Sequence, residues 1–257
     1  MKTRQLNASR QRRVSVRAGF SLIDILVSIA VIAVLIGMLL PKLSSVHESA
    51  RRVSCQSNVR QIGVGVMTYA NDYRGYIPPS IYLPESSTGM APQNMNTLRT
   101  DDGRWDGMGV LYSLEYTAAH KVFYCPSHKG EKPLNKYTGL FKNNPGGEIL
   151  SNYHYRGEGP AGHGPGGPTT RNLDKIDPAY SSLISDSMQL RSDYSHKVGA
   201  NFFRADLSVH WYNDPGSNLR LELPETKEEA DIQFEYVVEL WNKFDDAANA
   251  ERNGENP

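Results

Sequence analysis

The chain has 257 residues and only two cysteines, Cys55 and Cys125. Two cysteines cannot supply the paired C-x-x-C motifs that identify structural zinc sites. His120 and His128 flank Cys125, but one cysteine and two histidines at mixed spacing do not replace that signature. The sequence therefore predicts no zinc centre.

An excess of charge of either sign is also lacking, because the formal net charge is zero. Gly157, Gly159 and Gly162 form a formal G-x-G-x-x-G, but Pro160 and Pro165 leave no helix N-terminus there to receive a phosphate. We therefore expect an irregular loop, and no nucleotide or nucleic-acid partner.

No acidic residue precedes Asp24, and the chain has one long apolar run. From Ile25 to Leu40 there are 16 uncharged residues, and adding Phe20 to Ile23 gives the roughly 20 residues that span a bilayer as a helix. The segment ahead of this run is basic through Lys2, Arg4, Arg10, Arg12, Arg13 and Arg17. By the positive-inside rule that flank stays in the cytoplasm, so the bulk of the chain faces outward.

Asp24 is the anomaly of this apolar segment. A carboxylate at the centre of a spanning helix costs about 2.5–3.5 kcal/mol on insertion scales, and less near the end. Either the carboxylate extends to the cytoplasmic interface, or a partner in the membrane pairs with it.

The segment Gly19-Phe-Ser-Leu-Ile-Asp24 followed by a long apolar helix resembles the signal of type IV prepilins and type II secretion pseudopilins. The resemblance implies cleavage by a prepilin peptidase after Gly19, N-methylation of Phe20, and assembly through Asp24, the fifth residue of the mature chain. That family usually has glutamate at the fifth place. Pro41 would be the twenty-second mature residue, where many pilins also have proline. Such a proline kinks a helix.

Removal of residues 1–19 would change the net charge. The leader holds six of the 28 basic residues and no acid, so the mature chain has 22 basic against 28 acidic residues, or about −6. The basic leader is therefore no evidence for nucleic-acid binding.

Beyond Pro41 the pattern becomes amphipathic, with Val59, Ile62, Val66 and Tyr69 at helical spacing. The helix should run to about Asp72, and Gly75, Pro78 and Pro79 should end it. We expect this stripe to pack on the chain's own globular domain, with a coiled-coil partner as the alternative.

Residues 76–212 are rich in turn-forming residues and contain short apolar runs, which suggest strands. These runs are Gly109–Leu114, Lys121–Cys125 and Ser182–Ser185. We expect an α+β fold in which an antiparallel sheet packs on the back half of the long helix. The expected divisions are a leader at 1–19, a transmembrane helix at 20–41, its amphipathic continuation at 42–74, a periplasmic pilin-like domain at 75–215, and an acidic helical extension at 216–257.

The C-terminal extension has ten acids against three bases from Glu225 to Pro257. It predicts one amphipathic helix with a frayed tail, whose apolar face comprises Phe234, Val237, Trp241, Phe244 and Ala248. This face should pack on the domain; docking to another subunit or an envelope protein is the alternative.

The stretch from His196 to Trp211 resembles the prepilin-associated H-X9-DG domain. His196 and Asp206 match its spacing, while Leu207 stands where that family has glycine. Three further stretches resemble the same group: Cys55–Gly63, Tyr69–Pro78 and Val122–Ser127. We expect a structural hydrogen bond between His196 and Asp206, and a turn altered at Leu207.

Cys55 and Cys125 would both lie outside the cytoplasm, where disulfides persist. A bridge between them would tie the long helix to the sheet; two buried, unpaired thiols are the alternative. No cofactor is expected, although some pseudopilins of the major type carry calcium in a late loop. Asp186, Asp193 and Asp206 are the weak candidates for such a site.

The leading hypothesis is a non-catalytic, pilin-like subunit of a type II secretion pseudopilus or type IV pilus-like filament. Its expected partners are the prepilin peptidase, other pilin-like subunits, the inner-membrane assembly platform and membrane lipid. The alternative is a monomeric, inner-membrane-tethered periplasmic domain that binds a sugar, peptide or envelope polymer, with Trp105 and Trp211 as first contacts. An enzyme is not expected, since Ser195 and His196 are adjacent, adjacent side chains usually point apart, and the sequence has no G-x-S-x-G elbow.

Overall fold

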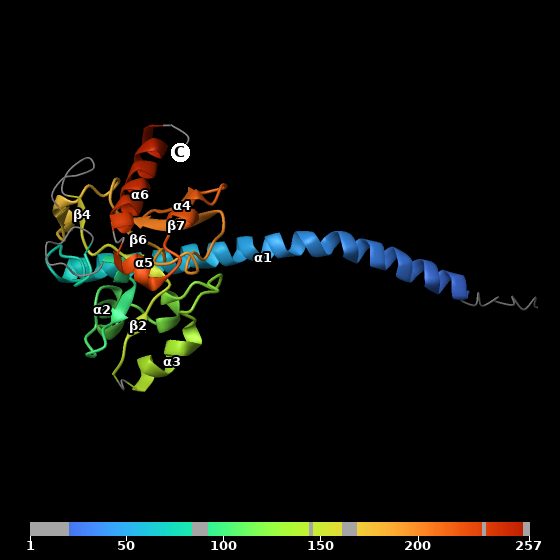
Figure 1. The fold of residues 1–257 in the computed structure, drawn as a ribbon, viewed down its shortest axis with the longest axis horizontal. Coiled ribbons are helices and arrows are strands. Elements are labelled where there is room, and N and C mark those ends of the chain that lie inside the picture. Colours follow the sequence, from blue (N-terminus) through green and yellow to red (C-terminus); the bar gives the residue numbers. More distant parts are fainter. Residues whose placement is uncertain (1–20, 84–91, 144–145, 161–168, 233–234, 254–257) are drawn as a thin grey trace, which may run out of the picture. The chain divides into compact units, whose positions relative to one another are not determined.

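The computed structural model describes residues 21–83, 92–143, 146–160, 169–232 and 235–253 (Figure 1). It divides into two compact units, residues 1–47 and residues 48–257, which are considered separately. Helix α1 (Leu22–Asp72) contributes its first part to one unit and its second part to the other. Gly19 and Phe20, which flank the expected cleavage site, lie outside the described segments.

The first unit consists of the apolar part of α1. Its segment Leu22–Leu40 is long and apolar enough to cross a membrane, and none of it is buried by the described residues. A signal sequence near an N-terminus has the same properties. The helix continues through Pro41, whose side chain is outside the described atoms.

The second part of α1 forms the centre of the globular unit. Cys55, Val59, Ile62 and Val66 are each fully buried, which confirms the apolar stripe read from helical spacing. The helix ends at Asp72, and the Gly75 N–H bonds back to the Ala70 carbonyl at 2.8 Å. Gly75 has φ +82°, a conformation that glycine adopts without steric cost.

A four-stranded antiparallel sheet packs beside this helix, in the order β3-β6-β7-β8. Its strands are β3 (Tyr153–Tyr155), β6 (Ser182–Asp186), β7 (Gly199–Arg204) and β8 (Val209–Asn213). Two-stranded sheets form from β1 (Thr97–Arg99) with β2 (Ile149–Leu150), and from β4 (Gly159–Pro160) with β5 (Thr169–Thr170). The expected α+β class with small antiparallel sheets is therefore correct.

The two faces of the sheet meet different helices. Phe203 faces α1 so closely that a Cβ at Gly63 would lie 2.3 Å from its ring. The neighbouring Phe202 points to the opposite face, where its ring lies 5.1 Å from that of Phe244 in α6 (Glu235–Asn253). This alternation follows from the period of two in a strand, and it places the sheet between two helices (Figure 1).

Two of the three expected strands were wrong. Gly109–Leu114 lies largely in helix α2 (Met108–Ser113), and Lys121–Cys125 lies largely in the 3-10 helix η2 (His120–Phe123). The buried residues of α2 are Met108, Gly109 and Leu111, and two adjacent buried residues do not fit the alternation of a strand with one buried face. Helix α3 (Leu134–Asn143) and the 3-10 helices η1 (Pro92–Asn94) and η3 (Leu173–Lys175) complete the central region.

The described residues of the C-terminal region form three helices, not the single expected one. These are α4 (Asn218–Glu222), α5 (Lys227–Ile232) and α6. Val237, Trp241 and Phe244 are fully buried in α6, so the expected apolar face packs on the chain's own sheet. Of the expected face, Phe234 lies outside the described segments, and the side chain of Ala248 is not described.

Candidate functional site

The first turn of α1 contains a capping box formed by Ser21 and Asp24. The Ser21 backbone N–H donates to Asp24 Oδ2 at 3.0 Å, and the Ile23 N–H donates to Ser21 Oγ at 3.3 Å. A serine followed three residues later by an acid satisfies two N–H groups that a helix start leaves unpaired. Asp24 thus has a local hydrogen-bond partner. The sequence carries a signal for this cap, Ser-x-x-Asp ahead of an apolar run.

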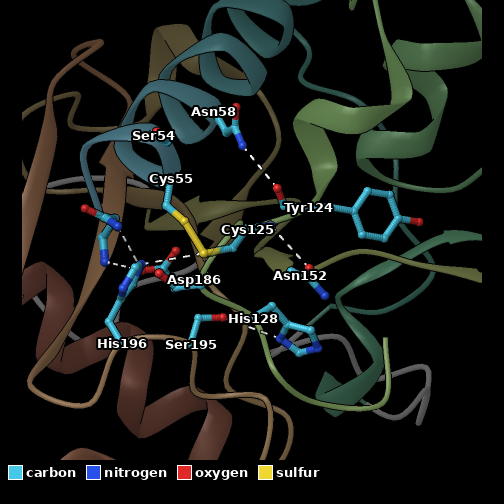
Figure 2. Close-up of a disulfide and its surroundings, with 12 residues drawn as sticks. Ser54, Cys55, Asn58, Tyr124, Cys125, His128, Asn152, Asp186, Ser195 and His196 are labelled. Atoms are coloured by element: carbon cyan, nitrogen blue, oxygen red, sulfur yellow. Dashed lines mark hydrogen bonds and ion pairs between the residues drawn. A yellow bond between two sulfur atoms is a disulfide. The ribbon is translucent and has the colours of Figure 1, made fainter. Parts of the chain in front are cut away.

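The two cysteines form a disulfide between α1 and the segment after η2 (Figure 2). Cys55 and Cys125 are joined Sγ to Sγ across 70 residues of sequence, and both are buried. Two hydrogen bonds hold the chain around the bridge. Asn58 Nδ2 of α1 donates to the Tyr124 carbonyl at 3.1 Å, and the Cys125 N–H donates to Oδ1 of Asn152, just before β3, at 3.2 Å. The bridge therefore connects the long helix to the domain that packs on it.

His196 lies against this disulfide and does not contact Asp206. Its Nε2 is 3.6 Å from Cys125 Sγ, and its Nδ1 is 2.9 Å from Glu48 Oε1 in α1. Asp206 instead accepts a hydrogen bond from the Ser208 N–H at 2.9 Å. The expected His196–Asp206 hydrogen bond was wrong because the whole of strand β7 separates them, and each strand residue advances the chain by about 3.3 Å.

Leu207 occupies the position that was expected to alter the turn. The turn between β7 and β8 is closed by an Arg204 N–H to Ser208 carbonyl bond at 3.0 Å, and Leu207 has φ +70°. A three-residue hairpin loop commonly ends with a residue in this left-handed conformation, for which glycine is preferred. The turn thus keeps the positive φ that suits glycine, although a leucine occupies it.

The three aspartates named as calcium candidates have separate protein partners. Asp186 Oδ2 accepts hydrogen bonds from the Asn201 N–H at 2.6 Å and Nδ2 at 3.0 Å. Asp193 pairs with the buried Lys132 Nζ at 2.6 Å, while Asp206 is held within its own turn. Burial raises the pKa of Asp186, partly opposed by the nearby His196.

Ser195 approaches a histidine other than its neighbour. Its Oγ lies 3.5 Å from His128 Nδ1, at the limit of hydrogen bonding, and it also donates to the Asp193 carbonyl at 3.3 Å. Burial lowers the pKa of His128, and its Nε2 is buried with no hydrogen-bond partner among the described residues. Figure 2 shows this pair beside the disulfide cluster.

The two tryptophans proposed as ligand contacts lie in different surroundings. Trp105 packs at the edge of the main core, 5.4 Å from the ring of Tyr112 and 6.0 Å from that of Phe141. Trp211 is in β8, with the Arg52 guanidinium 3.4 Å from its ring centroid. Trp211 also lines an open pocket of about 290 Å³ between β8 and α6, together with Tyr212, Asn213, Lys243, Asp246, Ala247 and Ala250.

Comparison with known proteins identifies one family and no individual relative. No curated protein and no solved structure matches the chain. A family model matches residues 44–193, which is more than half of the 257 residues. This match includes both cysteines and strands β3 and β6 of the four-stranded sheet, but it begins after Asp24 and ends before His196. The chain therefore belongs to the family described as "Protein of unknown function (DUF1559)".

Proposed function

We propose that this protein is a non-catalytic, pilin-like subunit that a prepilin peptidase cleaves after Gly19. Phe20 would then be N-methylated, and the subunit would assemble through its N-terminal helix into a pseudopilus or type IV pilus-like filament. In this proposal the leader is cytoplasmic, the apolar helix crosses the inner membrane, and the globular unit is periplasmic. Its partners are the peptidase, other pilin-like subunits, the assembly platform and membrane lipid.

The observation that carries the proposal is the dual use of α1. Its residues Leu22–Leu40 bury nothing within the chain, whereas Cys55, Val59, Ile62 and Val66 of the same helix lie in the core. An apolar helix that no other part of its chain covers needs lipid or the helices of other subunits around it. A secretion signal that is removed by cleavage would not be expected to continue as one helix into the core of the mature domain.

Two further facts support this proposal. Gly37 has nothing within 4 Å of the place where a Cβ would stand, so no packing within the chain requires glycine there. Small residues let helices approach closely in membranes, and Ala30, Ala33 and Gly37 recur at about one-turn spacing. Membership of the family that matches residues 44–193 is compatible with a pilin-like protein.

The test is mass spectrometry of the intact protein and its N-terminal peptide, purified from its native membrane. The proposal expects a chain that begins at methylated Phe20. A chain that keeps residues 1–19, or one cut beyond Leu40, would contradict it. A Gly19→Leu variant provides the control, because it should keep the leader while the globular unit stays folded.

The pocket beside Trp211 favours one alternative, a tethered domain that binds a sugar or peptide. An aromatic ring, an amide, a lysine and an aspartate converge there, which is a combination common in sites for polar ligands. Its volume of about 290 Å³ is at the low end for small-molecule sites. Under this alternative, Trp211→Ala removes ligand binding, whereas loss of Asp24 leaves it intact.

A further inference from the structure

The surroundings of the disulfide have the composition of a metal site. Cys55 Sγ, Cys125 Sγ and a ring nitrogen of His196 lie within 4.8 Å of one another, and all three residues are buried. They come from α1, from the segment after η2 and from the segment before β7, so the tertiary fold brings them together. Among the described residues, no other group of histidine, cysteine or acidic side chains meets this condition.

Glu48 fixes the orientation of the His196 ring. Its carboxylate oxygen Oε1 lies 2.9 Å from His196 Nδ1 and also accepts a hydrogen bond from Ser127 Oγ at 3.0 Å. A carboxylate accepts only, so the ring proton belongs on Nδ1 and the lone pair of Nε2 faces Cys125 Sγ, 3.6 Å away. Histidines that bind a metal through one ring nitrogen commonly donate the other ring N–H to a carboxylate.

Asp186 brings a negative charge close to the same histidine, although it is not one of the three side chains that meet the 4.8 Å condition. Its Oδ2 is 3.8 Å from His196 Nε2, and its side chain is 1% exposed. The other oxygen, Oδ1, is buried and accepts no hydrogen bond among the described residues. A buried carboxylate that lacks a donor on one oxygen is unfavourable, and a cation bound by the neighbouring side chains would offset its charge.

The separation of sulfur and nitrogen matches that of a tetrahedral zinc site. With Zn–S of about 2.3 Å and Zn–N of about 2.0–2.1 Å, adjacent sulfur and nitrogen ligands stand about 3.6 Å apart. The observed distance from Cys125 Sγ to His196 Nε2 is 3.6 Å. After reduction the two sulfurs, which are bonded to each other in the disulfide, would separate to about 3.8 Å.

We propose that, in the dithiol state, Cys55, Cys125 and His196 bind one divalent cation of the zinc class beside the Asp186 carboxylate, and that the disulfide is the metal-free state of the same site. Conversion needs a thioredoxin-class dithiol. Its two thiols are oxidised to a disulfide, and the two electrons and two protons pass to Cys55 and Cys125. The cation then displaces both thiol protons and binds two thiolates.

This site differs from the grouping of His120, Cys125 and His128 that the sequence spacing excluded. His196 is 71 residues from Cys125, and Cys55 is 70 residues away on the other side, so no local motif exists to reveal the set. The family match also ends before His196, so the inference rests on the geometry alone.

The test titrates Co²⁺, as a spectroscopic substitute for Zn²⁺, into the full-length protein in detergent, before and after reduction with a phosphine. We expect one Co²⁺ per reduced chain, with the visible bands of tetrahedral cobalt and a sulfur-to-cobalt charge-transfer band. The disulfide form should show neither band. Far-ultraviolet circular dichroism follows the fold throughout.

Variants assign the ligands. His196→Ala should weaken cobalt binding at least tenfold, and Glu48→Gln should weaken it about tenfold through loss of the supporting carboxylate. The matched control, His120→Ala, should leave the affinity unchanged, since His120 is outside the cluster. If His196→Ala fails to fold in its disulfide form, Glu48→Gln decides.

Three results would overturn the proposal. The first is a reduced chain that keeps its fold but gives no cobalt bands. The second is a chain that loses its fold on reduction and does not regain it with metal. The third is cobalt affinity that is the same in wild type, His196→Ala and Glu48→Gln. That result would mean that the thiols bind metal without His196.

Discussion

Arg156 and Asp245 form a buried ion pair that fastens helix α6 to the sheet. Arg156 Nη1 lies 2.6 Å from Asp245 Oδ2, and the two side chains are 2% and 1% exposed. Asp245 Oδ1 also accepts the backbone N–H of Ser182, at the start of β6, at 2.7 Å. The Asp245 carboxylate thus binds both Arg156, which follows β3, and the backbone of β6. Trp241 and Phe244 of the same helix are part of the hydrophobic core beside it.

Breaking this pair should destabilise the globular unit strongly. Asp245→Asn removes the carboxylate charge that pairs with the buried Arg156, and removal of one partner of such a pair costs about 3–5 kcal/mol. The measurement is the free energy of unfolding in urea, followed by tryptophan fluorescence because Trp241 is nearby.

The exposed pair of Arg191 and Glu225 provides the control for this experiment. Its side chains are 29% and 65% exposed, and such surface pairs contribute about 0–1 kcal/mol. Glu225→Gln should therefore have little effect. Equal losses from the two variants would show that burial does not set the strength of the Arg156–Asp245 pair.

Replacement of Leu207 by glycine should stabilise the β7–β8 hairpin. Leu207 has φ +70° and is 44% exposed, so it bears the steric cost of a left-handed conformation with little compensating burial. Relief of that cost, less the backbone entropy that glycine loses on folding, should raise the free energy of unfolding by about 0.5–1 kcal/mol. Leu207→Ala is the matched control, since it removes the same side chain but keeps a Cβ. An alanine variant as stable as the glycine variant would refute the conformational explanation.

The long helix was predictable because its signals are local. Val59, Ile62 and Val66 repeat at helical spacing, and Gly75 lies just beyond the observed end at Asp72. Short elements were not predictable in the same way. A short, mostly apolar run of six residues fits a strand or nearly two turns of a helix, and tertiary packing made α2 from the run that begins at Gly109.

The surroundings of His196 show where sequence spacing fails. The pattern from His196 to Asp206 suggested that the two residues meet, but spacing carries no information about the extended strand between them. The observed partner, Glu48, is 148 residues away in sequence, and only the packing of α1 beside the sheet brings it close. Pairing of Cys55 with Cys125 was easier to anticipate, because a chain with two cysteines allows one intramolecular disulfide.

Acid should destabilise the domain through His154. This residue in β3 is fully buried, neither ring nitrogen has a hydrogen-bond partner among the described residues, and burial lowers its pKa to about 3. Between pH 6.5 and 3 the unfolded chain therefore binds a proton that the folded chain excludes, so stability falls as pH falls, by up to about 1.4 kcal/mol per pH unit for one group.

Urea unfolding at pH 7, 5.5 and 4.5 measures this dependence on pH. His154→Leu should reduce the loss of stability between pH 5.5 and 4.5 by about 1 kcal/mol, while its stability at pH 7 stays close to wild type because no hydrogen bond is removed. The control is His120→Leu, at a partly exposed site, which should change the slope less. An unchanged slope in His154→Leu would mean that His154 takes up a proton in the folded state.

Asp24 has two possible roles, and Ser21 separates them. In the capping box, Asp24 accepts the Ser21 N–H and Ser21 Oγ accepts the Ile23 N–H, so loss of either side chain weakens the same helix end by about 0.5–2 kcal/mol. In filament assembly only the carboxylate has a function, because it would pair with the N-terminal amine of a neighbouring subunit.

We expect Asp24→Ala to abolish assembly and Ser21→Ala to preserve it. Asp24→Glu should support assembly, because glutamate is the usual residue at this position in the pilins that the chain resembles. The measurement is crosslinking between subunits in the native membrane, with equal amounts of processed protein as the reference. Equal defects in Ser21→Ala and Asp24→Ala would assign Asp24 to the helix cap alone, since the only property that the two residues share is that cap.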